Sequence, residues 1–236
     1  MYKPADDLIL RAVATLLLLV SQAIPAEECL DVSPASLGDC LQDSGWEQTH
    51  QADGISIYSR RTPDSNVREV LAAVLIRASS RTVESILTGF EQYTDFMPET
   101  LERCELLHRE SDSYWVFQQL NLPFVSDRFY TIRLQSTHSA QTPERFRLSW
   151  SLAKETEYRR RGHGEEVKMN NGSWLLMGQP DGTTLLRYQV HTDPGHLWGW
   201  VVNFANSVAV PDLVKAVKHR AESVSLPSRD PSPPGG

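Results

Sequence analysis

Asn121-Leu-Pro-Phe-Val-Ser-Asp-Arg-Phe-Tyr-Thr-Ile-Arg133 is a proline turn that runs into a strand-like segment. Pro123 interrupts the strand before it, because proline lacks a backbone N–H and fixes its own φ. The residues from Phe129 to Leu134 are rich in aromatic and β-branched side chains, which favour an extended strand. This segment therefore predicts one strand of a sheet, entered through a turn.

Six strand-like segments follow Pro98, and short polar turns separate them. They span residues 101–109, 114–122, 128–137, 145–152, 167–179 and 183–192. The last two flank Asp181-Gly182, a dipeptide that is typical of a tight hairpin turn. Consecutive strands joined by short turns predict an antiparallel meander.

Further elements are predicted on both sides of this meander. Upstream, strands at 55–59 and 67–78 form a hairpin. The side chains expected to share one face of the second strand are Val70, Ala72, Val74 and Ile76. A helix then begins after Ser79-Ser80 and keeps helical spacing of its apolar residues up to Tyr93. A long apolar helix follows Asp193-Pro-Gly195, with a kink or break expected at Pro211.

These elements predict an α+β fold in which a curved antiparallel β-sheet wraps around the long C-terminal α-helix. This arrangement is a helix grip, and an internal apolar cavity would form between the sheet and the helix. The chain of 236 residues, 40% hydrophobic and 22% charged, has the composition of a globular protein. Its net charge of −7 argues against a nucleic-acid partner, because such proteins usually carry a basic face.

The N-terminal residues 1–26 predict a signal peptide. An apolar run at 12–20 follows two basic residues, and small residues up to Ala26 suit cleavage. We therefore expect an exported protein with a periplasmic location. Asp6 and Asp7 depart from the usual positive end, so an uncleaved anchor and a cytoplasmic helix stay open as alternatives.

The rest of the chain divides into three parts. Residues 27–45 form an N-terminal segment, 46–224 form the main domain, and 225–236 form a proline-rich tail that we expect to be disordered. Cys29 and Cys40 flank a short stretch rich in proline, serine and glycine. We expect these two cysteines to form a disulfide in an oxidising compartment.

No sequence pattern predicts catalysis or a metal site. There is no Gly-x-Ser-x-Gly elbow and no Cys-x-x-Cys pair. Cys104 lies in a strand-like run, and we expect it to be a buried small hydrophobe instead of a reactive thiol. His191 and His196 lie near Asp193, but no further ligand follows at the spacing typical of metal sites. We therefore expect a protein that is not an enzyme and that needs no cofactor or metal.

Three segments resemble the steroidogenic acute regulatory-related lipid-transfer (START) domain family. They are residues 122–133, the acidic-Pro-Gly turn at 193–195, and Trp200-Val-Val-Asn203 followed by Pro211-Asp-Leu213. The segments occur in the order of that family, and the likeness spans residues 46–224. The resemblance implies a helix-grip fold with a tunnel for one lipid and a C-terminal helix that acts as a movable lid. Together with the predicted signal peptide, the chain resembles a bacterial-type exported member of this family.

The resemblance also implies part of a ligand-binding site. Arg133 matches the family's arginine after the signature strand, and the position of its acidic partner falls near Gln118, which is uncharged. Gln118 could still hydrogen-bond a hydroxyl group, and Glu102 or Glu105 on a neighbouring strand could replace the acid. Phe117, Trp174 and Met177 are candidate wall residues on the strands. Apolar side chains wrap far around the C-terminal helix, and those expected to line the cavity are Trp198, Val201, Ala205 and Val208.

We therefore expect a protein that binds a single lipid or other apolar small molecule in its cavity and transfers it between membranes. It would act as a monomer with transient membrane contact. Two alternatives stay open. One is an enzyme of the same fold superclass, such as a cyclase, an aromatase or a hydrolase that acts on an apolar substrate. The other is a partner-binding module with a vestigial cavity.

Overall fold

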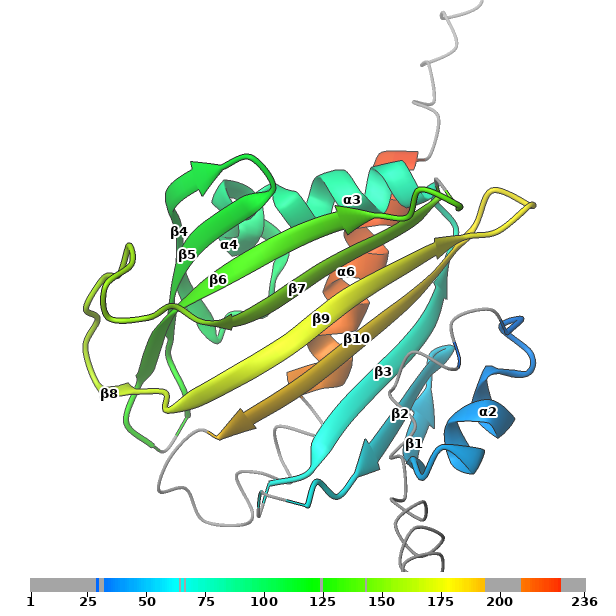
Figure 1. The fold of residues 1–236 in the computed structure, drawn as a ribbon, viewed down its shortest axis with the longest axis horizontal. Coiled ribbons are helices and arrows are strands. Elements are labelled where there is room, and N and C mark those ends of the chain that lie inside the picture. Colours follow the sequence, from blue (N-terminus) through cyan, green and yellow to red (C-terminus); the bar gives the residue numbers. More distant parts are fainter. Residues whose placement is uncertain are drawn as a thin grey trace, which may run out of the picture. The chain divides into compact units, whose positions relative to one another are not determined.

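The structure, a computed structural model, describes residues 29, 32–63, 65, 67–123, 125–142, 144–193 and 209–225 (Figure 1). The chain divides into two compact units, residues 1–44 and 45–236. In the first unit, helix α2 spans Leu37–Asp43 and buries Leu37 and Leu41, which lie one turn apart. A disulfide joins Cys29 to Cys40 of this helix, the pair expected from the sequence, with their Cα atoms 5.9 Å apart.

The second unit is built on a ten-stranded sheet, drawn in Figure 1. Its strands are β1 (Glu47–Ala52), β2 (Ile55–Arg60), β3 (Glu69–Ile76), β4 (Leu101–Glu110), β5 (Ser113–Leu120), β6 (Arg128–His138), β7 (Arg145–Leu152), β8 (Glu165–Glu166), β9 (Met169–Gly178) and β10 (Thr184–Asp193). The order across the sheet is β1-β2-β3-β10-β9-β7-β6-β5-β4, and every neighbouring pair in it is antiparallel. β8 lies off this path and pairs in parallel with the start of β6.

The helices of this unit lie on one face of the sheet. They are α3 (Ser80–Thr88), the 3₁₀ turn η1 (Phe90–Gln92), α4 (Tyr93–Phe96) and α6 (Val210–Ser225). The side chain of Ser79 accepts the backbone N–H of Thr82 and so caps the start of α3. α6 packs against β2, β3 and α3, while α3 packs against β7 and β9 (Figure 1). We call the face that these helices cover the inner face, and the opposite one the outer face.

The hydrophobic core lies between the inner face and the helices. Val70, Ala72, Val74 and Ile76 are all buried in it, as the alternation of β3 predicts. From the helix side, α6 contributes Val210, Val214, Val217 and Ala221, spaced by three and four residues. The predicted α+β helix grip, a curved antiparallel sheet with a C-terminal helix against it, is confirmed.

Three details differ from the predictions. β1 was not predicted, because all six of its residues are exposed and no alternation of apolar side chains marks it. The predicted helix up to Tyr93 is broken at Gly89 into α3, η1 and α4. Pro211 lies in the first turn of α6, while the predicted helical residues before Ala209 fall outside the described part of the chain.

Over the described residues, no helix has both the length and the apolar composition to cross a bilayer.

Candidate ligand-binding site

Three uncharged polar side chains lie side by side on the inner face. Cys104, Gln118 and Tyr130 come from β4, β5 and β6, and the strand register pairs each with the next. The Tyr130 hydroxyl donates a hydrogen bond to Gln118 Oε1 at 2.6 Å, and Gln118 Nε2 donates to Cys104 Sγ at 3.8 Å. We call this set the polar row. Its only short bond is the one between Tyr130 and Gln118, so Gln118 still has hydrogen-bonding capacity to offer.

An aromatic cluster continues the inner face on the neighbouring strands. Trp150 of β7 stacks on Tyr188 of β10 with ring centroids 5.7 Å apart, and Trp174 of β9 lies 4.4 Å from Tyr188. We call these three residues the aromatic wall. Trp150 lies against the backbone of Gly172, where a Cβ atom would collide with the indole ring and with the Gln189 carbonyl. Glycine at this position therefore allows the wall to lie flat on the sheet.

Asn170 connects the aromatic wall to the polar row. Its Oδ1 accepts a hydrogen bond of 3.0 Å from Trp150 Nε1, and both side chains are buried. Burial raises the pKa of Tyr130, and a hydrogen bond with the Asn170 side chain opposes that rise. The polar groups of the inner face thus form one connected patch within an apolar surface.

The titratable groups of this patch are uncharged at neutral pH, and burial moves their pKa values further above it. Burial raises the pKa of the Cys104 thiol to about 12, opposed by the hydrogen bond from Gln118 and reinforced by Glu91. Burial likewise raises the pKa of Tyr130 well above its ordinary value, as it does that of Tyr188. The site therefore offers neutral hydrogen-bond donors and acceptors rather than charges.

Part of this inner surface is accessible. Gln118, Leu120 and Tyr188 are only half-buried, although they point to the face that the helices cover. The fully buried Val116 and Leu186 lie further along β5 and β10. The described helices therefore do not fill the end of the inner face where the polar row lies.

The structure places two of the predicted strand residues on the inner face and three on the outer face. Gln118 and Trp174 are part of the patch described above. Phe117, Arg133 and Met177 point the opposite way, because side chains alternate along a strand and their neighbours Val116, Ile132 and Leu176 belong to the inner core. The expectation that these three residues line the cavity is therefore corrected.

The outer-face positions have their own partners. Phe117 is fully buried, with the Arg103 guanidinium 5.7 Å from its ring centroid. Arg133 Nη1 lies 3.6 Å from Glu157 Oε1, and its guanidinium lies over the ring of Trp115. Arg133 thus takes part in a surface ion pair and not in a polar clamp for a ligand. Trp198, Val201, Ala205 and Val208 lie outside the described residues, so their role stays a prediction.

Sequence reasoning missed Tyr130, Asn170, Trp150 and Tyr188. The alternation of strand residues could have placed Tyr130 on the face of Ile132, but only the register shows that it lies beside Gln118. Asn170 and Trp150 are 20 residues apart, and nothing in the sequence indicates their hydrogen bond.

An open cleft of about 470 Å³ lies elsewhere, beside the loop that follows β7. Its lining residues are Thr131, Leu152, Ala153, Lys154, Glu155, Arg159, Glu166, Val167 and Lys168. Five of these nine side chains are charged, so the cleft does not suit an apolar ligand.

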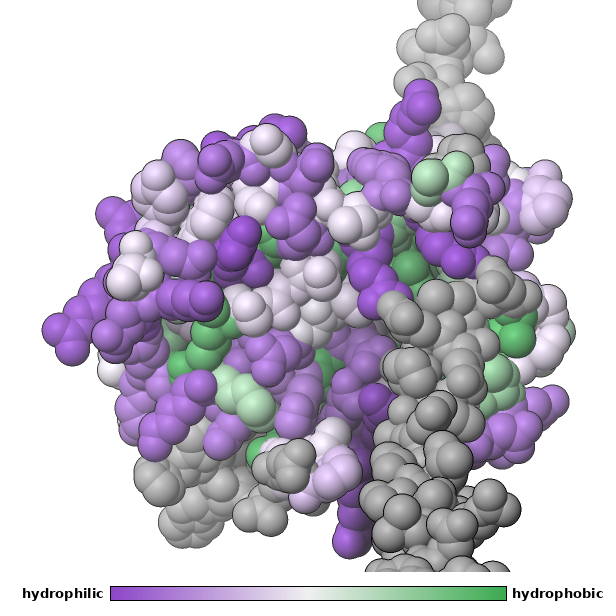
Figure 2. Space-filling model, in the orientation of Figure 1, coloured by the Kyte–Doolittle hydropathy of each residue, from purple (hydrophilic) through white to green (hydrophobic). Residues whose placement is uncertain are grey.

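Figure 2 views the molecule from the outer side, where polar residues predominate and hydrophobic ones form small separate patches.

No protein-family model matches the chain. Over 188 residues it is 22% identical to an uncharacterised protein of Pseudomonas aeruginosa, a match that covers 78% of this chain and 90% of that protein. Among solved structures, it is similar to a STAR-related lipid transfer protein fragment from Xanthomonas axonopodis. That match has a TM-score of 0.67 and 20% identity over 75% of this chain and 98% of the fragment.

A second similar structure is human StAR-related lipid transfer protein 5. Here the TM-score is 0.69 at 12% identity, with 84% of this chain and 98% of that chain covered. The chain is therefore a helix-grip protein, and its structural neighbours are START-related lipid-transfer domains. At these identities the similarity establishes the fold and leaves the ligand to be argued from the site.

Proposed function

We propose that this protein binds one lipid or other apolar small molecule between the inner face of its sheet and the C-terminal helix. The observation that carries the proposal is the polar row, with Cys104 and Gln118 half-buried, set in an apolar face beside the aromatic wall. A concave, mainly apolar site with few polar groups is typical of small-molecule binding. The similarity in fold to lipid-transfer domains supports the same function.

The polar row also suggests which ligands bind. Cys104, Gln118 and Tyr130 are uncharged at neutral pH, and burial holds the pKa values of Cys104 and Tyr130 high. A charged headgroup beside them would lose its hydration without gaining a counter-ion, which is costly. We therefore favour a ligand with one neutral hydrogen-bonding group, such as a hydroxyl or a carbonyl.

Binding needs no covalent step. A ligand that buries about 400 Å² of apolar surface gains about 10 kcal/mol before the costs of association. The Cys104 thiol is the nucleophilic group of the polar row, and a pKa of about 12 keeps it protonated and weakly reactive. These features favour a carrier over the alternative of an enzyme with an apolar substrate.

Transfer between membranes, export to the periplasm and a monomeric state are further parts of this proposal. Export rests on the N-terminal sequence, and transfer rests on the fold of the neighbours. The mass of the protein purified from its own host tests export, because cleavage within residues 1–26 would shorten the chain by a defined amount. Movement of a bound lipid between donor and acceptor vesicles tests transfer.

Native mass spectrometry of the protein from its own host, followed by extraction with organic solvent, tests the binding itself. We expect one apolar molecule with a neutral polar group per chain. In a Gln118→Leu variant the bound amount should fall about tenfold, since one hydrogen bond is worth up to about 1.5 kcal/mol. Gln135→Leu is the matched control, because Gln135 is half-buried on the outer face of the adjacent strand. A wild-type protein without any bound molecule would contradict the proposal. Equal amounts of bound ligand in the two variants would show that the polar row does not contribute to binding.

A further inference from the structure

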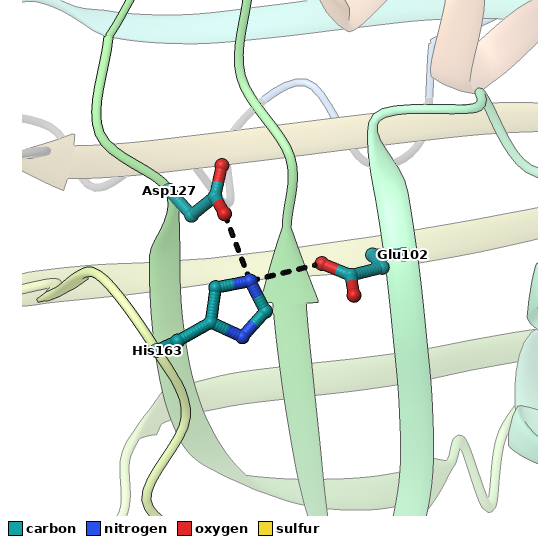
Figure 3. Close-up of side chains that lie close together, drawn as sticks. All are labelled: Glu102, Asp127 and His163. Carbon is teal, nitrogen blue, oxygen red and sulfur yellow. Dashed lines mark ion pairs between the residues drawn. The ribbon is translucent and has the colours of Figure 1, made fainter.

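A second cluster lies on the outer face, at the opposite side of the same strands. It unites Glu102 of β4, Asp127 just before β6, and His163 in the loop between β7 and β8 (Figure 3). His163 Nε2 lies 2.8 Å from Asp127 Oδ2 and 3.3 Å from Glu102 Oε2. The three ligand atoms thus converge from segments that are far apart in the sequence.

A buried glutamine fixes the backbone of His163 from both sides. Gln119 is fully buried, its Oε1 accepts the His163 N–H at 3.1 Å, and its Nε2 donates to the His163 carbonyl at 3.0 Å. One side chain therefore satisfies both main-chain groups of a loop residue. These two hydrogen bonds tie the backbone of His163 to β5.

The two glycines around His163 allow this close approach. A Cβ atom at Gly162 would collide with Gln119 and Phe129, and one at Gly164, where φ is +85°, would collide with the Asp127 carbonyl. The loop is thereby pressed against the strand ends on both sides of the histidine. The imidazole of His163 lies between the carboxylates of Glu102 and Asp127.

This arrangement suits a divalent cation better than a proton. A proton on Nε2 can form only one well-directed hydrogen bond, whereas two carboxylates face that nitrogen. Zinc binds imidazole nitrogen and carboxylate oxygen at about 2.1 Å, so that neighbouring ligand atoms lie about 3.0 to 3.4 Å apart. The distances of 2.8 and 3.3 Å in the cluster are close to that range.

Nearby arginines are directed to other carboxylates. Arg103 and Arg160 both pair with Glu105, and Arg128 pairs with Glu165 at 3.3 Å. None of these three ion pairs involves Glu102 or Asp127. The charge of the Glu102 and Asp127 carboxylates can instead be matched by a bound cation.

We propose that Glu102, Asp127 and His163 bind a zinc ion, with water completing its coordination. The ion joins the loop after β7 to the ends of β4 and β6, and so stabilises this side of the sheet. This site is separate from the inner face, so the proposal stands or falls independently of ligand binding there.

Isothermal titration with zinc chloride tests the site, using protein without a histidine tag and treated with a chelator beforehand. We expect one zinc ion per chain, and in His163→Ala an affinity at least about 100-fold weaker, since even the outer partners of metal ligands contribute 10- to 100-fold. His138→Ala is the matched control. The His138 side chain is 54% exposed, compared with 56% for His163, but faces a single carboxylate, that of Glu84, at 3.0 Å.

Two further measurements make the test specific. Glu102→Gln keeps the shape of the side chain and should also weaken zinc binding, while circular dichroism checks that the fold is unchanged. Zinc should raise the midpoint of thermal unfolding of the wild type and of His138→Ala but not that of His163→Ala. No stoichiometric binding by the wild type, or equal binding by the two histidine variants, would overturn the proposal.

Discussion

Gln118 and Gln119 are adjacent on β5, yet they do opposite things on the two faces of the sheet. Gln118 points to the inner face, is half-buried, and has Tyr130 and Cys104 as side-chain partners. Gln119 points to the outer face, is fully buried, and makes three hydrogen bonds to backbone groups, two of them to His163.

The difference shows how an amide can serve either binding or stability. A half-buried amide with one strong side-chain partner can exchange that partner for a ligand at little cost. A fully buried amide that satisfies main-chain groups cannot be released without leaving them unpaired. On the inner face, the amide of Gln118 can therefore exchange its side-chain partner for a ligand. On the outer face, the amide of Gln119 holds the loop that contains His163 in place.

The largest effect is expected from Gly172→Ala, which would disturb the inner face where the aromatic wall lies flat. The added methyl group would collide with Trp150 and with the Gln189 carbonyl, so either the indole or the pairing of β9 with β10 must shift. We expect a loss of about 3 kcal/mol in the free energy of unfolding, measured with urea. Ser173→Ala, at the next position with its side chain on the outer face, is the control and should cost less than about 0.5 kcal/mol. A cost for Gly172→Ala as small as that of the control would mean that the wall does not depend on this close approach.

Gln119→Ala compares the two glutamines directly. Removal of the buried amide leaves backbone groups of Arg128 and His163 without their partner, which should lower the free energy of unfolding by about 2 kcal/mol. Gln118→Ala should lower it by less than about 1 kcal/mol, because its partners are side chains on a partly accessible surface. Similar losses in the two variants would show that both amides are structural, which would weaken the argument for ligand exchange at Gln118.

Most of the strand layout could be predicted from the sequence, because turns and alternation are local signals. The hairpin before α3 and the six strands from β4 to β10, apart from the short β8, lie within a few residues of their predicted bounds. β1 and β8 were not predicted, because all their residues are exposed and no alternation of apolar and polar side chains marks them. The pairing of β10 with β3, which places the first hairpin beside the last, joins segments that are far apart in the sequence.

The candidate site was harder to predict because face assignment depends on an alternation that is easily misread by one residue. Phe117 and Gln118 were both proposed, although adjacent strand residues point to opposite faces. The Glu102, Asp127 and His163 cluster was missed entirely, since it joins three separate segments and depends on the loop position that Gln119 fixes.

The smallest effect is expected at the edge of the inner face, where Glu222 of α6 meets the end of β3. Desolvation acts to raise the pKa of Glu222, but hydrogen bonds from Lys218 and Arg77 outweigh it and lower the pKa to about 2. A lowered pKa means that the carboxylate stabilises the fold above about pH 4.5, and that this contribution is lost as the pH falls toward 2.

Glu222→Gln should therefore cost up to about 1 kcal/mol at pH 7, a limit set by solvent screening, and much less near pH 2.5. Urea unfolding at both pH values measures the difference, with Glu110→Gln as a control at an exposed strand end. An equal cost at both pH values would assign the role of Glu222 to packing instead of charge. If the loss of stability in Glu222→Gln disappears in acid, the charge of Glu222 stabilises the contact between α6 and β3 through Lys218 and Arg77. Charges would then act at the edge of the inner face, while the groups of the polar row stay neutral.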